Sequence, residues 1–197
     1  MNTFKRIIFF VFSFFILFLP CFPSDWTEGS LFLKNGDTLS VPLKYSLSHS
    51  VVYSRKDDGK LKPWSCNKIT GFELLDDEGK VFRRCDILYY QSPNGTKEPA
   101  IFELLYLGTK YSLYRTNLYL VPESASLYDE FGLIGERKEL CAVNTSQEVI
   151  WFMLHKNHVL KLFSDKEKEV KNYVKEEKLR YLYLEDIISI FKFYNSL

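Results

Sequence analysis

The sequence has no excess of charge of either sign, because 26 Lys and Arg residues stand against 25 Asp and Glu residues. Nucleic-acid-binding proteins usually gather basic residues into a patch or stripe, and proteins held on anionic membranes carry dense clusters of Lys and Arg. The chain has neither feature. We therefore expect no nucleic-acid partner and no binding to a strongly anionic membrane surface.

Sequence motifs of catalytic and cofactor sites are also missing. The chain has no C-x-x-C pair, no G-x-S-x-G elbow, no glycine-rich phosphate loop and no EF-hand spacing. Glycine and proline number only 9 and 7, and the content of 46% hydrophobic and 26% charged residues is typical of a folded globular chain. These features predict a folded domain without a cofactor, and they favour a non-enzymatic protein over an enzyme.

Long hydrophobic runs are absent except near the N-terminus. Residues 7–19 are almost entirely apolar, follow Lys5 and Arg6, and end at Pro20. A basic start, an apolar stretch of about 7–15 residues and a helix-breaking end describe a secretory signal peptide, whereas crossing a bilayer takes about 20 apolar residues. Residues 1–24 are therefore predicted to be a cleaved signal peptide or an N-terminal anchor.

The processing of this segment decides whether the protein touches a membrane. Uncleaved, residues 7–19 would anchor the chain. Cys21 follows Phe-Leu-Pro, which is a weak lipobox, so lipidation of Cys21 is a further alternative. In each case we expect the folded part to be extracytoplasmic, in the periplasm, the outer envelope or the medium.

Cysteines are few, and an odd number remains if Cys21 leaves with the signal, namely Cys66, Cys85 and Cys141. A hairpin with its turn at residues 76–79 would place Cys66 and Cys85 about four residues out of register. At about 3.3 Å per residue that is about 13 Å, which is too far for a disulfide. We expect three buried cysteines of apolar character, with a redox or metal role as the alternative.

Short strands separated by turn residues are predicted for most of the chain. Aromatic residues make up 17% of the sequence, and such residues suit pleated, half-buried surfaces. Asn35-Gly36 is a strong hairpin signal, and residues 38–45 alternate between apolar and polar. Pro42 cannot donate a ladder hydrogen bond, which predicts an edge or a bulge there.

Helices are predicted only at the C-terminal end. Ser164 and Glu167 form a capping box ahead of a charged stretch. Apolar residues then recur at helical spacing: Leu184, Ile187, Ile188, Phe191 and Tyr194. The sequence thus predicts an α+β fold, mostly antiparallel β, barrel- or sandwich-like with about nine to eleven short strands, followed by two C-terminal helices. The β-rich domain would span residues 25–163, and residues 164–197 would form a helical pair packed on the same domain.

Residues 145–155 fit two interpretations. Thr145 to Glu148 could be a capping box that opens a helix. Residues 149–154, however, are continuously apolar, and His158-Val159-Leu160-Lys161-Leu162 follows a polar break at 155–157. This pattern is more typical of a buried hairpin, so we favour strands.

Two histidines form the candidate metal site. His155 and His158 have the H-x-x-H spacing of some metal sites, although a site needs further ligands. The simpler interpretation is a pair of polar residues flanking a turn. Pairing of Cys141 with either histidine would give an enzyme with a nucleophilic cysteine.

Five tyrosines form the candidate ligand-binding surface. They fall in neighbouring predicted strands, and exposed rings of this kind stack on sugars or anchor a partner protein. Buried, they would simply belong to the core. The five residues are Tyr89, Tyr106, Tyr111, Tyr114 and Tyr119.

Several short motifs occur in a fixed order along the chain. Asn35-Gly36-Asp37-Thr38 is followed by Ile69-Thr70-Gly71-Phe72-Glu73, then by Phe102-Glu103-Leu104-Leu105 with Gly108 and Ser112-Leu113-Tyr114, and finally by Glu185-Asp186-Ile187 with Phe193-Tyr194-Asn195. This order resembles a broad group of uncharacterised secreted bacterial proteins in which a β-rich domain ends in a short helical pair. The resemblance covers most of residues 29–197. It implies export and this architecture, and it brings no activity, cofactor or catalytic residue.

The functional expectation follows from export and from the missing catalytic motifs. We expect an exported extracytoplasmic protein, a non-enzymatic interaction or structural module of the cell envelope, whose partner is an envelope protein or a small ligand. A β-domain that binds a lipid or glycan is the first alternative, and an enzyme with a His/Cys site is the second.

Overall fold

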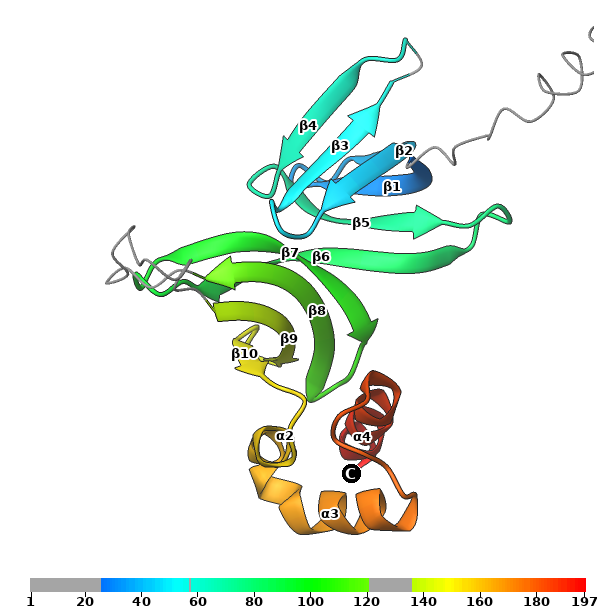
Figure 1. Ribbon diagram of the computed structural model, residues 1–197. Helices are drawn as coiled ribbons and strands as arrows, with labels where there is room; N and C mark the ends of the chain where they lie inside the picture. The colour runs from blue at the N-terminus through cyan, green and yellow to red at the C-terminus, as the bar shows by residue number, and fades with distance from the viewer. Residues whose placement is uncertain (1–25, 57, 121–135) are drawn as a thin grey trace, which may run out of the picture.

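The chain folds into one curved antiparallel sheet with helices at one end (Figure 1). The computed structural model describes residues 26–56, 58–120 and 136–197. The sheet has 10 strands in the order β10-β9-β8-β7-β6-β5-β1-β2-β3-β4. Its strands are β1 (Thr27–Leu33), β2 (Thr38–Ser46), β3 (Val51–Arg55), β4 (Leu61–Ser65), β5 (Ile69–Leu75), β6 (Val81–Gln91), β7 (Lys97–Tyr106), β8 (Tyr111–Leu120), β9 (Glu136–Asn144) and β10 (Val149–Phe152).

The predicted α+β class is confirmed, and the β part is a single open sheet. β4 and β10 lie at its two ends, and each pair of neighbours is antiparallel. The predicted signal or anchor segment and Cys21 lie outside the described residues.

Five hairpin turns share one hydrogen-bond pattern. In the β1–β2 turn, Leu33 N–H donates to the Asp37 carbonyl at 2.9 Å, and Gly36 N–H donates to the Leu33 carbonyl at 3.0 Å. The φ angle of Gly36 is 92°, so a type I turn ends in a left-handed residue. The turns at Gly59, Gly79, Gly95 and Gln147 repeat this pattern. The predicted Asn35-Gly36 hairpin is thereby confirmed.

Pro42 lies where strand pairing is incomplete. It pairs with Glu28 of β1, whereas the β2–β3 ladder begins only at Leu43. The prediction that this strand lies at an edge or carries a bulge is wrong, because β2 lies between β1 and β3 and pairs with both without a register shift.

The first core lies on one side of the sheet, which we call face A. Face A is the side that carries Phe72, Cys85 and Glu103, since strand pairing places these three residues side by side. Its buried residues form the β1–β7 core: Leu31, Leu43, Val52, Trp64, Cys66, Ile69, Phe72, Leu74, Cys85 and Ile101. No helix takes part in this core, because the strongly twisted strands themselves enclose it.

The second core lies on the opposite side, face B, of β6 to β10. It is the β6–β10 core: Tyr90, Ala100, Phe102, Tyr114, Leu118, Cys141 and Val143, with Leu88, Leu104, Val149 and Trp151 packed against it. The sheet curls so far that the ring of Trp151 on β10 comes within 6.0 Å of the ring of Tyr90 on β6.

The helices cover face A of the last strands. They are α2 (Lys156–Leu162), the 3-10 turn η2 (Ser164–Lys166), α3 (Glu167–Glu176) and α4 (Leu184–Ser196). The helical core combines sheet and helix residues: Leu113, Leu140, Ala142, Phe152, Val159, Leu160, Phe163, Val170, Val174, Ile187, Ile190, Phe191 and Tyr194. The predicted apolar stripe of α4 is therefore buried at Ile187, Phe191 and Tyr194, and Ile190 joins it.

The structure of residues 145–162 differs in part from the hairpin predicted from the sequence. Residues 149–152 are a strand, as favoured, and the helix starting at Thr145 to Glu148 does not form. The second half of the expected hairpin is wrong, because residues 156–162 are helical. The His155 ring accepts a hydrogen bond from Asn157 N–H at 3.3 Å and caps α2. Val159 and Leu160 then turn toward the helical core.

The cysteines behave as expected, although one register differs. Cys66, Cys85 and Cys141 are all buried and unpaired. Cys85 pairs with Phe72 and not with Thr70, because the β5–β6 turn is longer than assumed and a bulge falls between Leu74 and Leu75.

A partly buried ion-pair network on face A, centred on the buried Glu103, lies between the β1–β7 core and the helical core. The Glu103 carboxylate accepts from Arg83 Nε at 3.2 Å and from the Arg115 guanidinium at 2.8 Å. Arg83 also donates to the Tyr45 hydroxyl at 2.6 Å. Each side chain of this network has a partner within it, so the network links β2, which carries Tyr45, to the strands β6 to β8.

Candidate functional site

The five tyrosines do not form one surface. Tyr89 is exposed, and its hydroxyl accepts a hydrogen bond from Lys34 Nζ at 2.9 Å. Tyr114 is buried in the β6–β10 core, where its hydroxyl donates to Asp86 at 2.9 Å. Burial and the Asp86 carboxylate raise the pKa of Tyr114. The last of the five, Tyr119, has a side chain outside the described part.

Tyr106 and Tyr111 both pack at the helical end of the sheet. The Tyr111 ring lies 6.2 Å from the ring of Phe163 and 5.8 Å from that of Tyr194. Tyr111 is only partly buried, so one part of it remains accessible. It borders a hollow at this end of the sheet.

The two histidines have separate roles. His155 caps α2, and His158 follows on the first turn of that helix, with ring centroids 5.8 Å apart. Within residues 26–56, 58–120 and 136–197, no group of three or more His, Cys, Asp or Glu side chains lies close enough to hold a metal ion. The H-x-x-H pair therefore has no further ligand among the residues placed.

Cys141 lies in the β6–β10 core and faces away from α2. It pairs across the sheet with Trp151 on face B, whereas the helices lie on face A. Full burial raises the pKa of its thiol, which disfavours the reactive thiolate. Cys85 has the same character, since burial raises its pKa to about 12.

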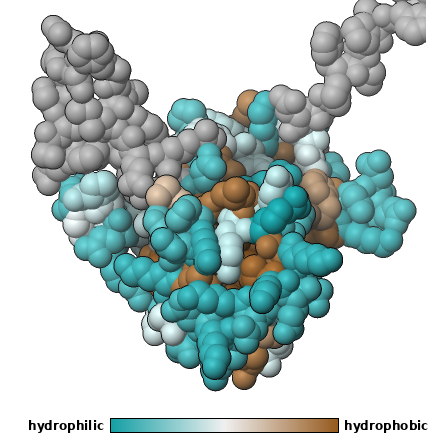
Figure 2. All heavy atoms as spheres, turned by 60° about the horizontal axis from the view of Figure 1, so that its bottom comes forward, coloured by the Kyte–Doolittle hydropathy of each residue, from teal (hydrophilic) through white to brown (hydrophobic). Residues whose placement is uncertain are grey.

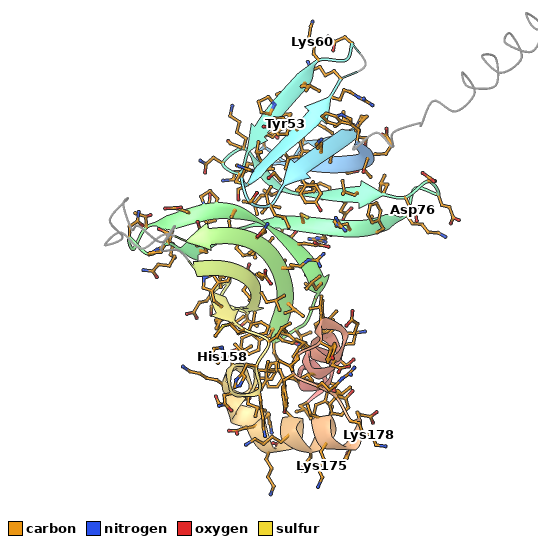
Figure 3. All side chains as sticks on the ribbon, viewed as in Figure 1. Tyr53, Lys60, Asp76, His158, Lys175 and Lys178 are labelled. Atoms are coloured by element: carbon orange, nitrogen blue, oxygen red, sulfur yellow. The ribbon has the colours of Figure 1, made fainter. Side chains whose placement is uncertain are left out.

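The hollow beside Tyr111 is what we call the β10–α2 cleft. It has a volume of about 350 Å³ and lies where α2 crosses the end of the sheet. It is lined by Tyr111, Ile150, Trp151, Phe152, His158, Lys161, Leu162 and Ser164. Tyr111 and His158, predicted for different sites, thus meet in one place, and Figure 3 shows His158 on α2 close to β10.

The cleft combines apolar walls with a few polar groups. His158 and Lys161 are three residues apart on α2 and so share a helix face. Ser164 adds a hydroxyl at the start of η2. In Figure 2, which brings the helical end forward, hydrophobic side chains remain visible at the centre of this face among hydrophilic ones. An apolar pocket with few convergent polar groups is the usual form of a small-molecule site.

Sequence reasoning missed Lys161 and Ser164 because it assigned residues 158–162 to a strand. On a strand, His158 and Lys161 would point to opposite faces. The recurrence of polar residues at 155, 158 and 161 was the available signal of a helix face.

A second hollow follows α3 and has a different character. Its volume is about 470 Å³, and its lining is polar throughout: Ser164, Asp165, Glu167, Lys168, Glu169, Lys171 and Asn172. Lys171 pairs with Glu167, and Lys166 pairs with Glu169 at 3.4 Å. These contacts are those of a solvated helix surface.

No protein-family model, no curated protein and no solved structure matches this chain. Among the residues that the structure describes, no helix is long and apolar enough to cross a membrane. The arguments for function therefore rest on the residues and the geometry of this chain.

Proposed function

We propose that this chain is an exported, non-enzymatic recognition protein of the cell envelope, and that it binds its partner at the β10–α2 cleft. Export is supported by the sequence of residues 1–24, where Lys5 and Arg6 precede an apolar stretch that ends at Pro20. The cell envelope or the medium would then be its place of action.

The observation that supports a recognition role is a difference between the polar groups that line the cleft and the polar groups elsewhere in the described residues. Outside the cleft, Glu103 is held by two arginines and the buried thiol of Cys141 has a raised pKa. Inside the cleft, His158, Lys161 and Ser164 line open space beside apolar walls. Such groups are available to a ligand without breaking the fold.

A catalytic role is supported less well by the same geometry. The nucleophile that sequence analysis considered, Cys141, belongs to face B, while His158 borders the cleft on face A. A cysteine–histidine pair needs hydrogen-bond contact of about 3 Å, and the sheet lies between these two residues.

Cell fractionation with intact-mass analysis of the natively expressed protein tests the exported part of the proposal. We expect an extracytoplasmic chain that has lost about the first 24 residues, or a membrane-bound chain that is lipidated at Cys21 or retains residues 7–19. Ile16→Arg, in the middle of the apolar stretch, should leave the chain in the cytoplasm, and Thr3→Arg is the matched control that should not. Wild-type protein found full-length in the cytoplasm would refute export.

A further inference from the structure

We infer that the β10–α2 cleft binds a small molecule with an anionic group, a carboxylate or a phosphate, on a compact apolar body. This inference rests on the proposed recognition role and names the ligand class for the same site. It follows from the size of the cleft, the sign of its charge and the stiffness of its walls.

The size of the cleft limits the ligand. A volume of about 350 Å³ is at the lower end of small-molecule sites, which span about 300–1,000 Å³. This space suits two fused rings or a short acyl chain. A folded partner would need a larger surface, since stable protein interfaces bury about 800 Å² on each side.

The charge of the cleft selects an anion. Among its lining residues none is acidic, and Lys161 contributes an ammonium group. The neighbouring lysines Lys166 and Lys171 pair with glutamates, whereas Lys161 has no ion-pair partner among the described residues. Beside it, the His158 ring and the Ser164 hydroxyl can both donate hydrogen bonds to carboxylate or phosphate oxygens.

The nearest carboxylate in sequence is already engaged. Asp165 accepts hydrogen bonds from the Tyr194 hydroxyl at 3.0 Å and 3.1 Å. Among the described residues it forms no ion pair with Lys161, and its hydrogen bonds to Tyr194 fix η2 against α4. An anionic group on a ligand would therefore be the ion-pair partner of the Lys161 ammonium group in the cleft.

The walls of the cleft are held in place before any ligand binds. Tyr111 packs against Phe163 and Tyr194, and α2 is anchored by the fully buried Val159 and by Leu160. Rigid walls lower the ordering cost of binding. Apolar contact with Ile150, Phe152 and Leu162 would hold the body of the ligand while its anionic group meets Lys161.

Titration with a matched set of probes tests this inference. The probes are 2-naphthoate, 2-naphthyl phosphate and the neutral 2-naphthamide, followed by calorimetry and by amide chemical shifts of the exported protein. We expect both anionic probes to bind about tenfold more tightly than 2-naphthamide, because a charge-assisted contact is lost in the amide. Lys161→Met keeps the apolar stem and should weaken the anionic probes about tenfold. Lys175→Met, on the outer side of α3 (Figure 3), should change nothing.

The outcomes separate the ligand class from the wider proposal. Equal binding of 2-naphthamide, equal effects of the two lysine variants, or no binding of any probe would overturn the anionic ligand. Shifts confined to Tyr111 and residues 150–164 support it, and a preference between the two anionic probes separates a carboxylate from a phosphate ligand. A cytoplasmic location would overturn export and leave the binding result standing, while loss of the charge preference would leave export standing.

Discussion

Strands β1 to β5 and strands β6 to β10 belong to one sheet but are stabilised in different ways. In the first half, face A is buried in the β1–β7 core, and polar residues such as Ser30, Ser40 and Lys44 lie on the other face. In the second half both faces are buried, face B by the curl of the sheet and face A by the helices. The difference teaches where a binding site can form in this fold.

The helical cover creates the cleft, because a helix laid across strand ends leaves a hollow that a twisted sheet alone does not. α2 is only 7 residues long and meets the sheet at Val159 and Leu160. The side of α2 that carries His158 and Lys161 then borders the cleft, together with Tyr111 and Phe152. The cleft therefore lies in the half of the sheet that the helices cover.

Removal of α4 is expected to have the largest effect on this contrast. A chain that ends at Lys178 loses Ile187, Ile190 and Phe191, all fully buried in the helical core. Each large side chain contributes about 1.5–3 kcal/mol when buried, so the three together contribute about 4.5–9 kcal/mol, which is comparable to the usual stability of a domain of about 5–15 kcal/mol. Thermal unfolding followed by circular dichroism should lose its cooperative transition. Removal of Leu197 alone should leave it intact, and an unchanged melting temperature of the shorter chain would show that α4 does not stabilise the sheet.

Glu103→Ala is expected to have the next largest effect, because it breaks the junction between the two halves. It leaves the partly buried Arg83 and Arg115 without their shared carboxylate. Removing one partner of a fully buried pair costs about 3–5 kcal/mol, and water reaches these arginines, so we expect about 3 kcal/mol. Denaturant unfolding measures the loss. Glu176→Ala on the exposed face of α3 is the control, and equal stability of the two variants would mean that the network contributes nothing.

Asn195→Ala should loosen the attachment of α4 to the β7–β8 turn. The side-chain oxygen Oδ1 of Asn195 accepts hydrogen bonds from the Lys110 N–H at 2.7 Å and from the Tyr111 N–H at 3.2 Å. Its amide donates to the carbonyl oxygens of Tyr111 and Phe191. Leaving these backbone groups unpaired costs about 2 kcal/mol, measured by denaturant unfolding. Asn172→Ala on α3 should be neutral, and a comparable loss there would argue against a specific role of Asn195.

Alkaline pH should weaken the fold through its buried thiols. Burial raises the pKa of Cys85 from 9.0 to about 12. The stability that the protonated Cys85 thiol gives to the folded state is therefore complete below pH 9 and is lost as the pH rises toward 12. The reason is that Cys85 loses its proton at a lower pH in the unfolded chain than in the folded one. By pH 10 the free energy of unfolding should fall by about 1 kcal/mol for this thiol. Cys85→Ala should give a shallower decline between pH 9 and 11, and an unaltered slope would contradict this origin.

Gln147→Gly should have the smallest effect and the opposite sign. Gln147 has a φ of 62° at the turn position where the four related turns have glycine. A side chain in the left-handed region costs about 1 kcal/mol, part of which is offset by the greater freedom of glycine in the unfolded chain. We expect stabilisation of about 0.5 kcal/mol by thermal unfolding. Gln147→Ala keeps a Cβ and should bring no gain, so equal stabilisation by both substitutions would exclude this cause.

The two halves also differ in how far their sequence predicts them. The β1–β2 hairpin and the apolar face of α4 follow from local patterns, since each buries one face, whereas the edge or bulge predicted at Pro42 does not occur. Residues 149–152 contact a core on each face, with Val149 and Trp151 on face B and Phe152 on face A, and the apolar run 149–154 carries no period. The strand was therefore predicted there, but the helix that follows was not. A bulge between Leu74 and Leu75 shifts the register of β5 against β6, and no local sequence pattern predicts this bulge.

The candidate site was predicted only in fragments for the same reason. Tyr111 and His158 were each singled out, but for a ligand surface and a metal pair that involve other residues. Their meeting depends on α2, whose position is set by burial of Val159 and Leu160 in a core assembled from distant segments. Lys161 belongs to the polar spacing at 155, 158 and 161 and Ser164 to the predicted capping box, but neither pattern indicates a cleft, so only the fold places them there.

Hydrogen–deuterium exchange of residues 25–197 with and without 2-naphthoate is the most direct test of the claim that the helix-covered half of the sheet is the binding half. The account predicts slower exchange in residues 150–164 and around Tyr111, because a ligand in the β10–α2 cleft restrains α2 against β10. Exchange in β1 to β5 should stay the same. Protection centred on β1 to β5, or no protection of α2 at a saturating concentration, would contradict it.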